Sequence, residues 1–342
     1  ISKSDFEAGF KFKHLGEVLY AKVKSEFEAV VKGESNGPAW ADAADGVYTA
    51  TATSSAADKE RLSTHIGGIA GKNDTSGIIE QCYIDNTRTG SITVKKGVTG
   101  VTIVLNGLTL TNDDSAAITL NKTAEASLIA AAGTTNTVAD TEGSNDENAA
   151  VKVKSGAALA IGGTGALTVD GNAKNGIKGA ADAVITVAEV KLNINAANDG
   201  LSCDDELNIT GGTLSITAGG DAVKASPDTG DTENPDTTSL GNVTISGGTL
   251  TLASGDDAVH ADNDLVVGVQ DSSSTSNPKI SITASCEGLE GTTVSVYSGD
   301  IDVVASDDGV NAANSELGEH SDKFAINIAG GDLYIDAGSD GL

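Results

Sequence analysis

The sequence predicts an all-β protein, a right-handed parallel β-helix with an N-terminal helical cap. A short motif recurs about every 21 to 24 residues once polar insertions are set aside. Each repeat holds three short runs of alternating apolar and polar residues, with no helix-length segment between them. A repeat this short cannot bury a core alone and must stack on its neighbours, which is the property of a solenoid.

The recurring motif is an acidic or amide residue, then Gly or Ala, then Leu or a β-branched residue. Its copies begin at Asn175, Asp199, Asp221, Asp257, Glu287, Asp308 and Asp340. A position that required positive φ would exclude Ala. The tolerance of Ala therefore predicts a crowded corner at which successive coils stack closely.

The three strands of a coil are clearest in one repeat, where they fall at residues 213–217, 223–225 and 242–246. Gly-Gly and Asp-Gly pairs mark the turns between them. We expect one elongated domain over residues 41–342, regular from about residue 91, with about nine or ten coils. At roughly 4.8 Å per coil the rod would be about 45 Å long.

Residues 1–40 differ from the rest of the chain. A capping box at residues 4–7 and apolar residues at helical spacing between residues 15 and 30 predict one or two amphipathic helices. Such a segment would cover the open strand edges of the first coil. A helix lying on a membrane surface is the alternative.

The charge of the chain restricts its partners. It has 21 basic and 49 acidic residues, a net charge of −28, which repels nucleic acid and anionic membranes and attracts cations. The sequence contains no apolar run of membrane-spanning length. The chain begins at Ile1 without Met, as expected after removal of an export signal, so we expect an extracellular or cell-surface location.

The cysteines and histidines do not form a recognisable metal motif in the sequence. Three cysteines without C-x-x-C spacing support neither a disulfide framework nor a zinc site, and we expect Cys203 and Cys286 to be buried in the repeats. The four histidines show no metal-ligand spacing and are expected on the surface. No Ser-His-Asp or Cys-His arrangement can be identified.

Several consecutive blocks resemble a known family. They are VTIVLNGLTLTN at residues 101–112, the stretches at 134–151 and 163–179, and the successive repeats at 208–225 and 244–261. Their content and order are similar to those of bacterial carbohydrate-binding β-helix proteins that are related in fold to polysaccharide lyases. The resemblance covers about residues 91–342.

This resemblance implies an exported protein that binds calcium through the acidic corner of the repeat and binds plant cell-wall polysaccharide. The implied ligands are acidic, polygalacturonate-like pectic chains and, as a second candidate, cellulose, without established catalysis. Carried over residue by residue, the acidic corner falls on Asn175, Asp199, Asp221, Asp257, Asp308 and Asp340, with Asp256 and Asp307 as preceding acids; all of these except Asp340 are the predicted metal positions. Glu287 departs from the family's usual Asp, which puts a metal position there in doubt.

The expected repulsion between stacked acidic corners also predicts bound calcium, independently of the resemblance. Stacked corners would place like charges about 4.8 Å apart, where each pair repels by about 1 kcal/mol in water and by several at an effective dielectric near 20. Calcium accepts six to eight oxygen ligands and would relieve this repulsion. The alternative is a ladder of Asx turns in which each Asp bonds the backbone at its own corner.

We predict a non-catalytic protein that binds acidic polysaccharide through calcium, because only 3% of the residues are aromatic and stacking on neutral sugars needs aromatic surfaces. One alternative is a calcium-dependent polysaccharide lyase with Lys178 or Lys224 as the base, although nearby carboxylates should raise a lysine pKa and make it a poor base. The other alternative is a non-catalytic surface rod or adhesin. Polar insertions at 226–240 and 313–322 leave the same corner and would wall a groove.

Overall fold

The computed structural model describes residues 39–42, 48–51, 82–143, 145–227, 240–270, 277–314 and 322–342, with side chains from residue 89 onward. The helical cap predicted for residues 1–40 lies outside these ranges, apart from its last two residues, which begin strand β1 (Ala39–Asp42). Strand β1 pairs in antiparallel orientation with β2 (Tyr48–Thr51). The described residues contain no helix, and therefore no helix that is long and apolar enough to cross a membrane.

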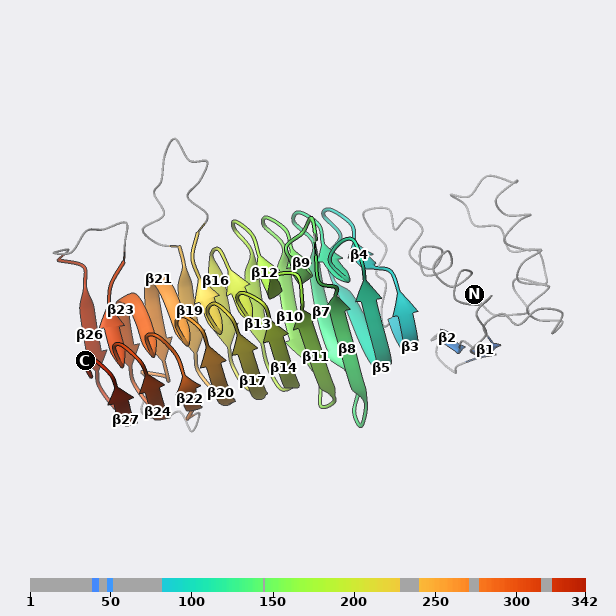
Figure 1. Ribbon diagram of the computed structural model, residues 1–342. Helices are drawn as coiled ribbons and strands as arrows, with labels where there is room; N and C mark the ends of the chain where they lie inside the picture. Colours follow the sequence, from blue (N-terminus) through green and yellow to red (C-terminus); the bar gives the residue numbers. More distant parts are fainter. Residues whose placement is uncertain are drawn as a thin grey trace.

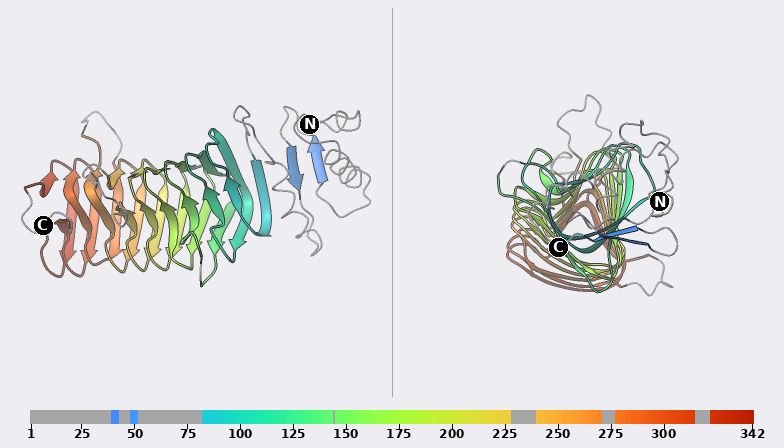
Figure 2. Two further views of the ribbon diagram at one scale, coloured as in Figure 1. Left: turned by 90° about the horizontal axis from the view of Figure 1, so that it is seen from above. Right: turned by 90° about the vertical axis from the view of Figure 1, so that its right-hand side faces the viewer.

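The other described strands form one sheet of 25 strands whose pairings are parallel. Each strand pairs with strands one coil before and one coil after it, so the sheet consists of three ladders running along a rod (Figure 1). Viewed along the rod, the ladders surround the interior (Figure 2). This is the topology of a parallel β-helix, which confirms that part of the predicted class.

The first ladder consists of β4 (Ile92–Val94), β6 (Ile118–Leu120), β9 (Ala149–Val153), β12 (Asn175–Gly179), β15 (Leu201–Cys203), β18 (Val223–Ala225), β21 (Val259–Val267), β23 (Leu289–Val296) and β25 (Val310–Ala312). The second consists of β3 (Cys82–Thr89), β5 (Val101–Asn112), β7 (Glu125–Ala130), β10 (Ala158–Gly162), β13 (Val184–Val187), β16 (Glu206–Ile209), β19 (Asn242–Ile245), the ends of β21 and β23, and β26 (Ala325–Ile328).

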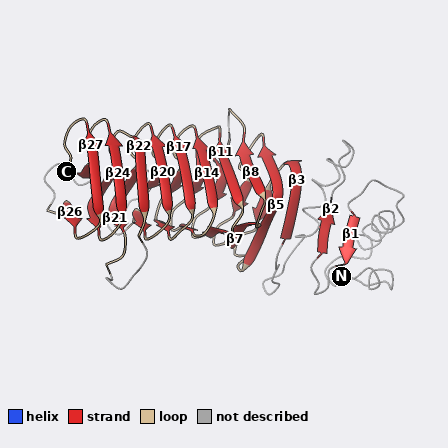
Figure 3. Cartoon of the chain, turned by 90° about the horizontal axis from the view of Figure 1, so that it is seen from below, coloured by secondary structure: helices blue, strands red, loops and turns tan. Residues whose placement is uncertain are grey.

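The third ladder, seen as one row in Figure 3, consists of the ends of β3 and β5, then β8 (Thr135–Asp140), β11 (Ala166–Gly171), β14 (Lys191–Ala196), β17 (Thr213–Ala218), β20 (Thr249–Ser254), β22 (Lys279–Ala284), β24 (Asp300–Ala305) and β27 (Asp332–Ala337).

Apolar and polar side chains alternate along the strands, and the apolar side chains form the core. In β17, Leu214 and Ile216 are buried, whereas Thr213, Ser215 and Thr217 are exposed, because successive side chains of a strand point to opposite faces. Inward residues stack on their counterparts in the next coil, as Ile216 does on Leu252. The interior is therefore a continuous column of aliphatic side chains.

One polar side chain, Asn136, lies within the rod and is fully buried. Its Oδ1 accepts hydrogen bonds from the backbone N–H groups of Gly107 and Leu108, both at 2.9 Å, and its Nδ2 donates to the carbonyl of Ala166 at 3.0 Å. Buried polar groups need such partners. Asn136 thus links three successive coils.

Two insertions interrupt the coils at equivalent places. Ala225 stacks on Ala261, which stacks on Gly291, which stacks on Ala312. The segments that follow Ala225 and Ala312 therefore leave the rod at the same edge of the first ladder, as predicted. Residues 228–239 and 315–321 lie outside the described part, so the prediction that they wall a groove stays a prediction.

Candidate functional site

The repeated corner lies between the third ladder and the first. At five steps between successive coils the side-chain oxygen of one corner residue accepts a hydrogen bond from the backbone N–H of the next coil's corner residue. The donor and acceptor pairs are Asp199 to Asn175 (3.1 Å), Asp221 to Asp199 (3.3 Å), Asp257 to Asp221 (2.9 Å), Glu287 to Asp257 (3.4 Å) and Asp340 to Asp308 (3.0 Å). We call this series the corner ladder. The corner ladder differs from the predicted alternative of Asx turns. In an Asx turn the side chain bonds the backbone of its own corner, whereas here it bonds the backbone of the following coil.

The residue after each corner is small because the corner is crowded. A Cβ added to Gly200 would lie 2.4 Å from Ile216 Cγ2 and 2.7 Å from the Ala222 carbonyl oxygen. Gly200 does not have positive φ, and Ala222 and Ala258 occupy equivalent positions fully buried. Close packing of coils, rather than backbone conformation, selects the small residue, as predicted.

The second carboxylate oxygen of two corner residues contacts a cationic side chain. Lys224 Nζ bonds Asp221 Oδ2, and one coil later His260 Nδ1 lies 2.9 Å from Asp257 Oδ2. Burial alone would lower the pKa of Lys224, but the carboxylates of Asp221, Asp199 and Asp262 together outweigh it and raise that pKa. A lysine held protonated in this way is a poor general base.

Lys224 and His260 belong to a line of outward-facing residues on the first ladder, one from each coil. We call this line the polar stripe. Its members in order are Lys152, Lys178, Ser202, Lys224, His260, Glu290 and Asn311. On a chain of strongly negative charge, this line gathers four basic side chains beside the corner ladder.

Lys152 and Lys178 face each other across adjacent coils, and both are half-buried. Burial, followed by the positive charge of Lys178, lowers the pKa of Lys152. Lys178 Nζ is 3.8 Å from Asp204 Oδ1. Like charges directly opposite each other destabilise a sheet. The charge of Asp204, which opposes the lowering of the Lys152 pKa, offsets part of this repulsion, and the remainder favours a further anion above the pair.

His260 is surrounded by carboxylates. Its Nδ1 is 2.9 Å from Asp257 Oδ2 and 3.1 Å from Glu290 Oε1, and its Nε2 is 2.8 Å from Asp262 Oδ1. The imidazole is 15% exposed. The expectation that the histidines lie on the surface holds only in part for His260, which lies on the outer face of the first ladder but is mostly buried, and Glu290 reaches it from the next coil. His14, His65 and His320 lie outside the described residues.

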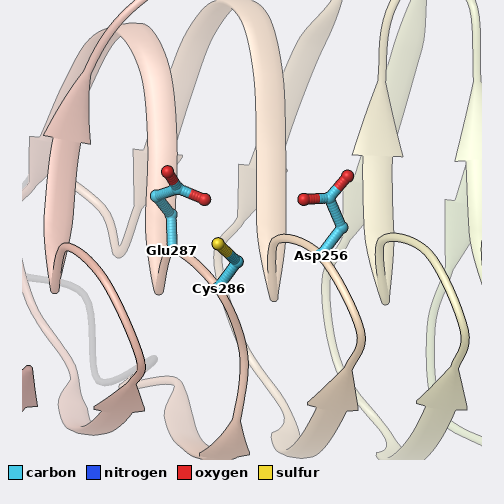
Figure 4. A group of neighbouring side chains, drawn as sticks. All are labelled: Asp256, Cys286 and Glu287. Carbon is cyan, nitrogen blue, oxygen red and sulfur yellow. The ribbon is translucent and has the colours of Figure 1, made fainter. Parts of the chain in front are cut away.

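A third group of side chains lies on the outer rim of the corner. Asp256 and Glu287 come from successive coils, and their carboxylates flank the Cys286 thiol (Figure 4). A hydrogen bond with Asp257, then burial, raises the pKa of Glu287 to about 7. Cys203 is buried as expected, but Cys286 is only half-buried, so that part of the prediction is wrong.

The structure divides the predicted metal positions into two rows. The inner row consists of the residues whose side-chain oxygens accept the hydrogen bonds of the corner ladder: Asn175, Asp199, Asp221, Asp257 and Asp308. Asp256 and Asp307 form the outer row and are exposed. The rows meet at one point, where ligand atoms of Asp221, Asp256 and Asp257 lie within 4.8 Å of one another.

The comparison with protein families bears on what this surface does. A model described as carbohydrate-binding domain-containing protein matches residues 84–341, about three quarters of the chain. The chain belongs to this carbohydrate-binding family. The match spans all three ladders, the corner ladder and the polar stripe, so carbohydrate is the class of partner to be considered for the family member described here.

No curated protein sequence matches this carbohydrate-binding protein. Among solved structures it is similar to one titled "Structure of the polysaccharide lyase-like protein from C. thermocellum, Gadolinium derivative", with 25% identity and a TM-score of 0.49. The similarity covers 73% of this chain and 86% of that one.

The corner ladder gives a prediction that separates its hydrogen bonds from its charge. Replacing Asp221 by Ala removes the acceptor of the Asp257 N–H and should destabilise the rod by about 1–3 kcal/mol relative to Asp221→Asn, which keeps Oδ1. Both variants lose the charge beside Lys224, so their difference in thermal unfolding isolates the acceptor. Equal stability of the two variants would contradict the ladder.

Proposed function

We propose that this protein binds an acidic, pectin-like polysaccharide along the polar stripe, with calcium held at the outer rim of the corner. The observation that carries the proposal is the half-buried Lys152 and Lys178 pair beside a row of carboxylates. Such a surface offers cations for sugar carboxylates and, within a few coils, oxygen ligands for calcium.

The lysine pair supplies the direct contact. A uronic acid carboxylate placed over Lys152 and Lys178 would accept charge-assisted hydrogen bonds from both and relieve their mutual repulsion. Neutral sugars would gain no such compensation. This physical difference supports an acidic polysaccharide over cellulose as the ligand.

The spacing of the stripe suits a polymer. Stacked strands place one stripe residue about every 4.8 Å, and an extended 1,4-linked chain of pyranose rings advances by a similar distance per ring. A polysaccharide parallel to the rod would thus present about one sugar to each coil. Lys178 and Lys224 stand two coils apart and would meet alternate sugars.

The outer rim supplies the calcium ligands in this proposal. Asp256 and Glu287 offer carboxylate oxygens, which calcium prefers. Burial, together with the hydrogen bond and charge of Glu287, raises the pKa of the Cys286 thiol to about 11, so the metal-free thiol carries no charge at neutral pH. Inner-row oxygens are already engaged by backbone N–H groups, Lys224 or His260, so the rim is the better site.

The proposed ligand also suggests where the protein acts. Pectic polymers are cell-wall components, and extracellular calcium sites work at roughly 10⁻⁴ to 10⁻³ M. A weak rim site of two carboxylates would be filled under such conditions. The proposal therefore includes an extracellular or cell-surface location.

The binding test uses retention of the protein on polygalacturonate gels, with cellulose as the neutral polymer. We expect retention on polygalacturonate that falls by at least tenfold in the Lys152→Gln, Lys178→Gln double variant, since each lost charge-assisted bond is worth about 1.5–3 kcal/mol. Lys191→Gln, an exposed lysine on β14, is the matched control. Equal retention of the double variant and the control would refute the stripe as the binding surface.

Calcium is tested separately by chelation and refilling. Calcium should raise the melting temperature of chelator-treated protein by an amount equivalent to about 2.7 kcal/mol at a hundredfold excess over its dissociation constant. Sodium at matched ionic strength should do much less. The Asp256→Asn, Glu287→Gln variant should lose the calcium effect, whereas Asp302→Asn, an exposed carboxylate on β24, should keep it.

The same experiments separate the alternatives. Ultraviolet-absorbing unsaturated products from polygalacturonate would identify a lyase. Calcium stabilisation without retention on any polysaccharide would favour a surface rod. Retention that survives both chelation and the rim variant would remove calcium from the binding mode and leave the lysines as its basis.

A further inference from the structure

The His260 cluster has the geometry of a metal site of a different kind from the calcium rim. Three donor atoms converge there: Asp257 Oδ2 from the corner, His260 Nδ1 from β21 and Glu290 Oε1 from β23 one coil later. Nδ1 lies 2.9 Å from the first oxygen and 3.1 Å from the second. Donors on adjacent corners of a coordination shell with bonds of about 2.0–2.2 Å stand about 3 Å apart.

The partners behind these donors strengthen that interpretation. His260 Nε2 is 2.8 Å from Asp262 Oδ1, and a carboxylate on the far nitrogen is the usual way in which a metal-ligating histidine is oriented. Asn311 donates to Glu290 Oε2 at 2.8 Å, and Ser226 donates to Asp262 Oδ2 at 2.8 Å. Each ligand is thus fixed by an outer hydrogen bond, and Nδ1 faces the two carboxylates.

The charges of the cluster favour a dication. Three carboxylates, from Asp257, Asp262 and Glu290, surround a single imidazole. With a protonated His260 the sum is three negative charges and one positive, or −2. With a neutral His260 and a divalent ion the sum is −3 plus 2, or −1. Exchange of the Nδ1 proton for a dication therefore reduces the imbalance.

We propose that Asp257, His260 and Glu290 bind a divalent first-row transition metal ion of the zinc type, with Asp262 as the residue that positions His260. The imidazole nitrogen selects such ions over calcium and magnesium, which prefer oxygen throughout. The ligand side chains are 8–15% exposed, so the site is mostly shielded and only a small part of it reaches solvent at the polar stripe. This site shares no proposed ligand with the Asp256 and Glu287 rim.

The experiment uses the full chain with His14, His65 and His320 replaced by Asn, so that His260 is the only imidazole. Zn²⁺ is titrated by calorimetry in the presence of excess Ca²⁺, and Co²⁺ is added while the imidazole signals are followed by NMR. We expect one equivalent of Zn²⁺ that Ca²⁺ does not displace. Co²⁺ should shift the His260 signals paramagnetically and give a visible absorption band.

Variants of the site complete the test. Replacing Glu290 by Gln or His260 by Asn should abolish stoichiometric Zn²⁺ binding, and Asp262→Asn should weaken it about 10- to 100-fold as expected for an orienting partner. The rim variant Asp256→Asn, Glu287→Gln should bind Zn²⁺ normally. Unshifted imidazole signals with Co²⁺ in the intact site, or Zn²⁺ binding equal in His260→Asn and its parent, would overturn the proposal.

Discussion

Replacing Ile216 by Asp is expected to prevent folding or leave the protein insoluble. Ile216 is 1% exposed and lies in the aliphatic column between Ile194 and Leu252. A carboxylate in that position has no partner, and an uncompensated buried charge costs several kcal/mol. Since a domain is stable by only about 5–15 kcal/mol, this one substitution removes much of the stability.

The matched control for this variant is Ser215→Asp, in the same strand but on its exposed face. Thermal unfolding followed by circular dichroism should give nearly the parental midpoint for Ser215→Asp and no cooperative transition for Ile216→Asp. A parental midpoint for Ile216→Asp would mean that the strand is turned over and its inner and outer faces are exchanged.

Replacing His260 by Gln should destabilise the metal-free protein strongly. The difference in free energy of unfolding between the parent and the variant should shrink as the pH rises. Burial alone would lower the pKa of His260, but hydrogen bonds with Asp257, Asp262 and Glu290 outweigh it and raise the pKa to about 11, against a smaller opposing effect of Lys224. Removal of one partner from such a buried group costs about 3–5 kcal/mol.

The sign of the pH dependence follows from the raised pKa. An unfolded histidine has a pKa of about 6.5, so the folded state holds the proton more tightly. The stabilisation is fully present below about pH 6.5 and is lost as the pH rises toward 11. Urea unfolding of both proteins with EDTA should therefore give the largest difference near pH 6. A difference that grows with pH would exclude a protonated His260.

The corners and their small residues were predictable because they repeat. Asp or Glu followed by Gly or Ala marks the same place in each coil, and parallel strands must then align those places. The stacking of Asp199, Asp221 and Asp257 follows from this alignment alone. The buried faces of the strands follow from the alternation of apolar residues, as Leu214 and Ile216 illustrate.

The His260 cluster could not be predicted, for a physical reason. Its members come from two coils, and Glu290 is brought beside His260 by the register that pairs β21 with β23, which shifts between Ala261 and Asp264. The sequence held only a weak signal for this cluster. His260 occupies the position of Lys224 one repeat later, and Asp262 follows two residues after it. Sequence spacing alone does not reveal a partner 30 residues away.

The bonds of the corner ladder do not depend on how much chain lies between their partners. Asp221 bonds a residue 36 positions away through the same atoms that join Asp199 to a residue 22 positions away. Doubling the length of a loop costs only about 0.6 kcal/mol in closure entropy, so the ladder readily tolerates such growth. The edge beside the polar stripe can thus acquire new loops while the scaffold that displays them stays unchanged.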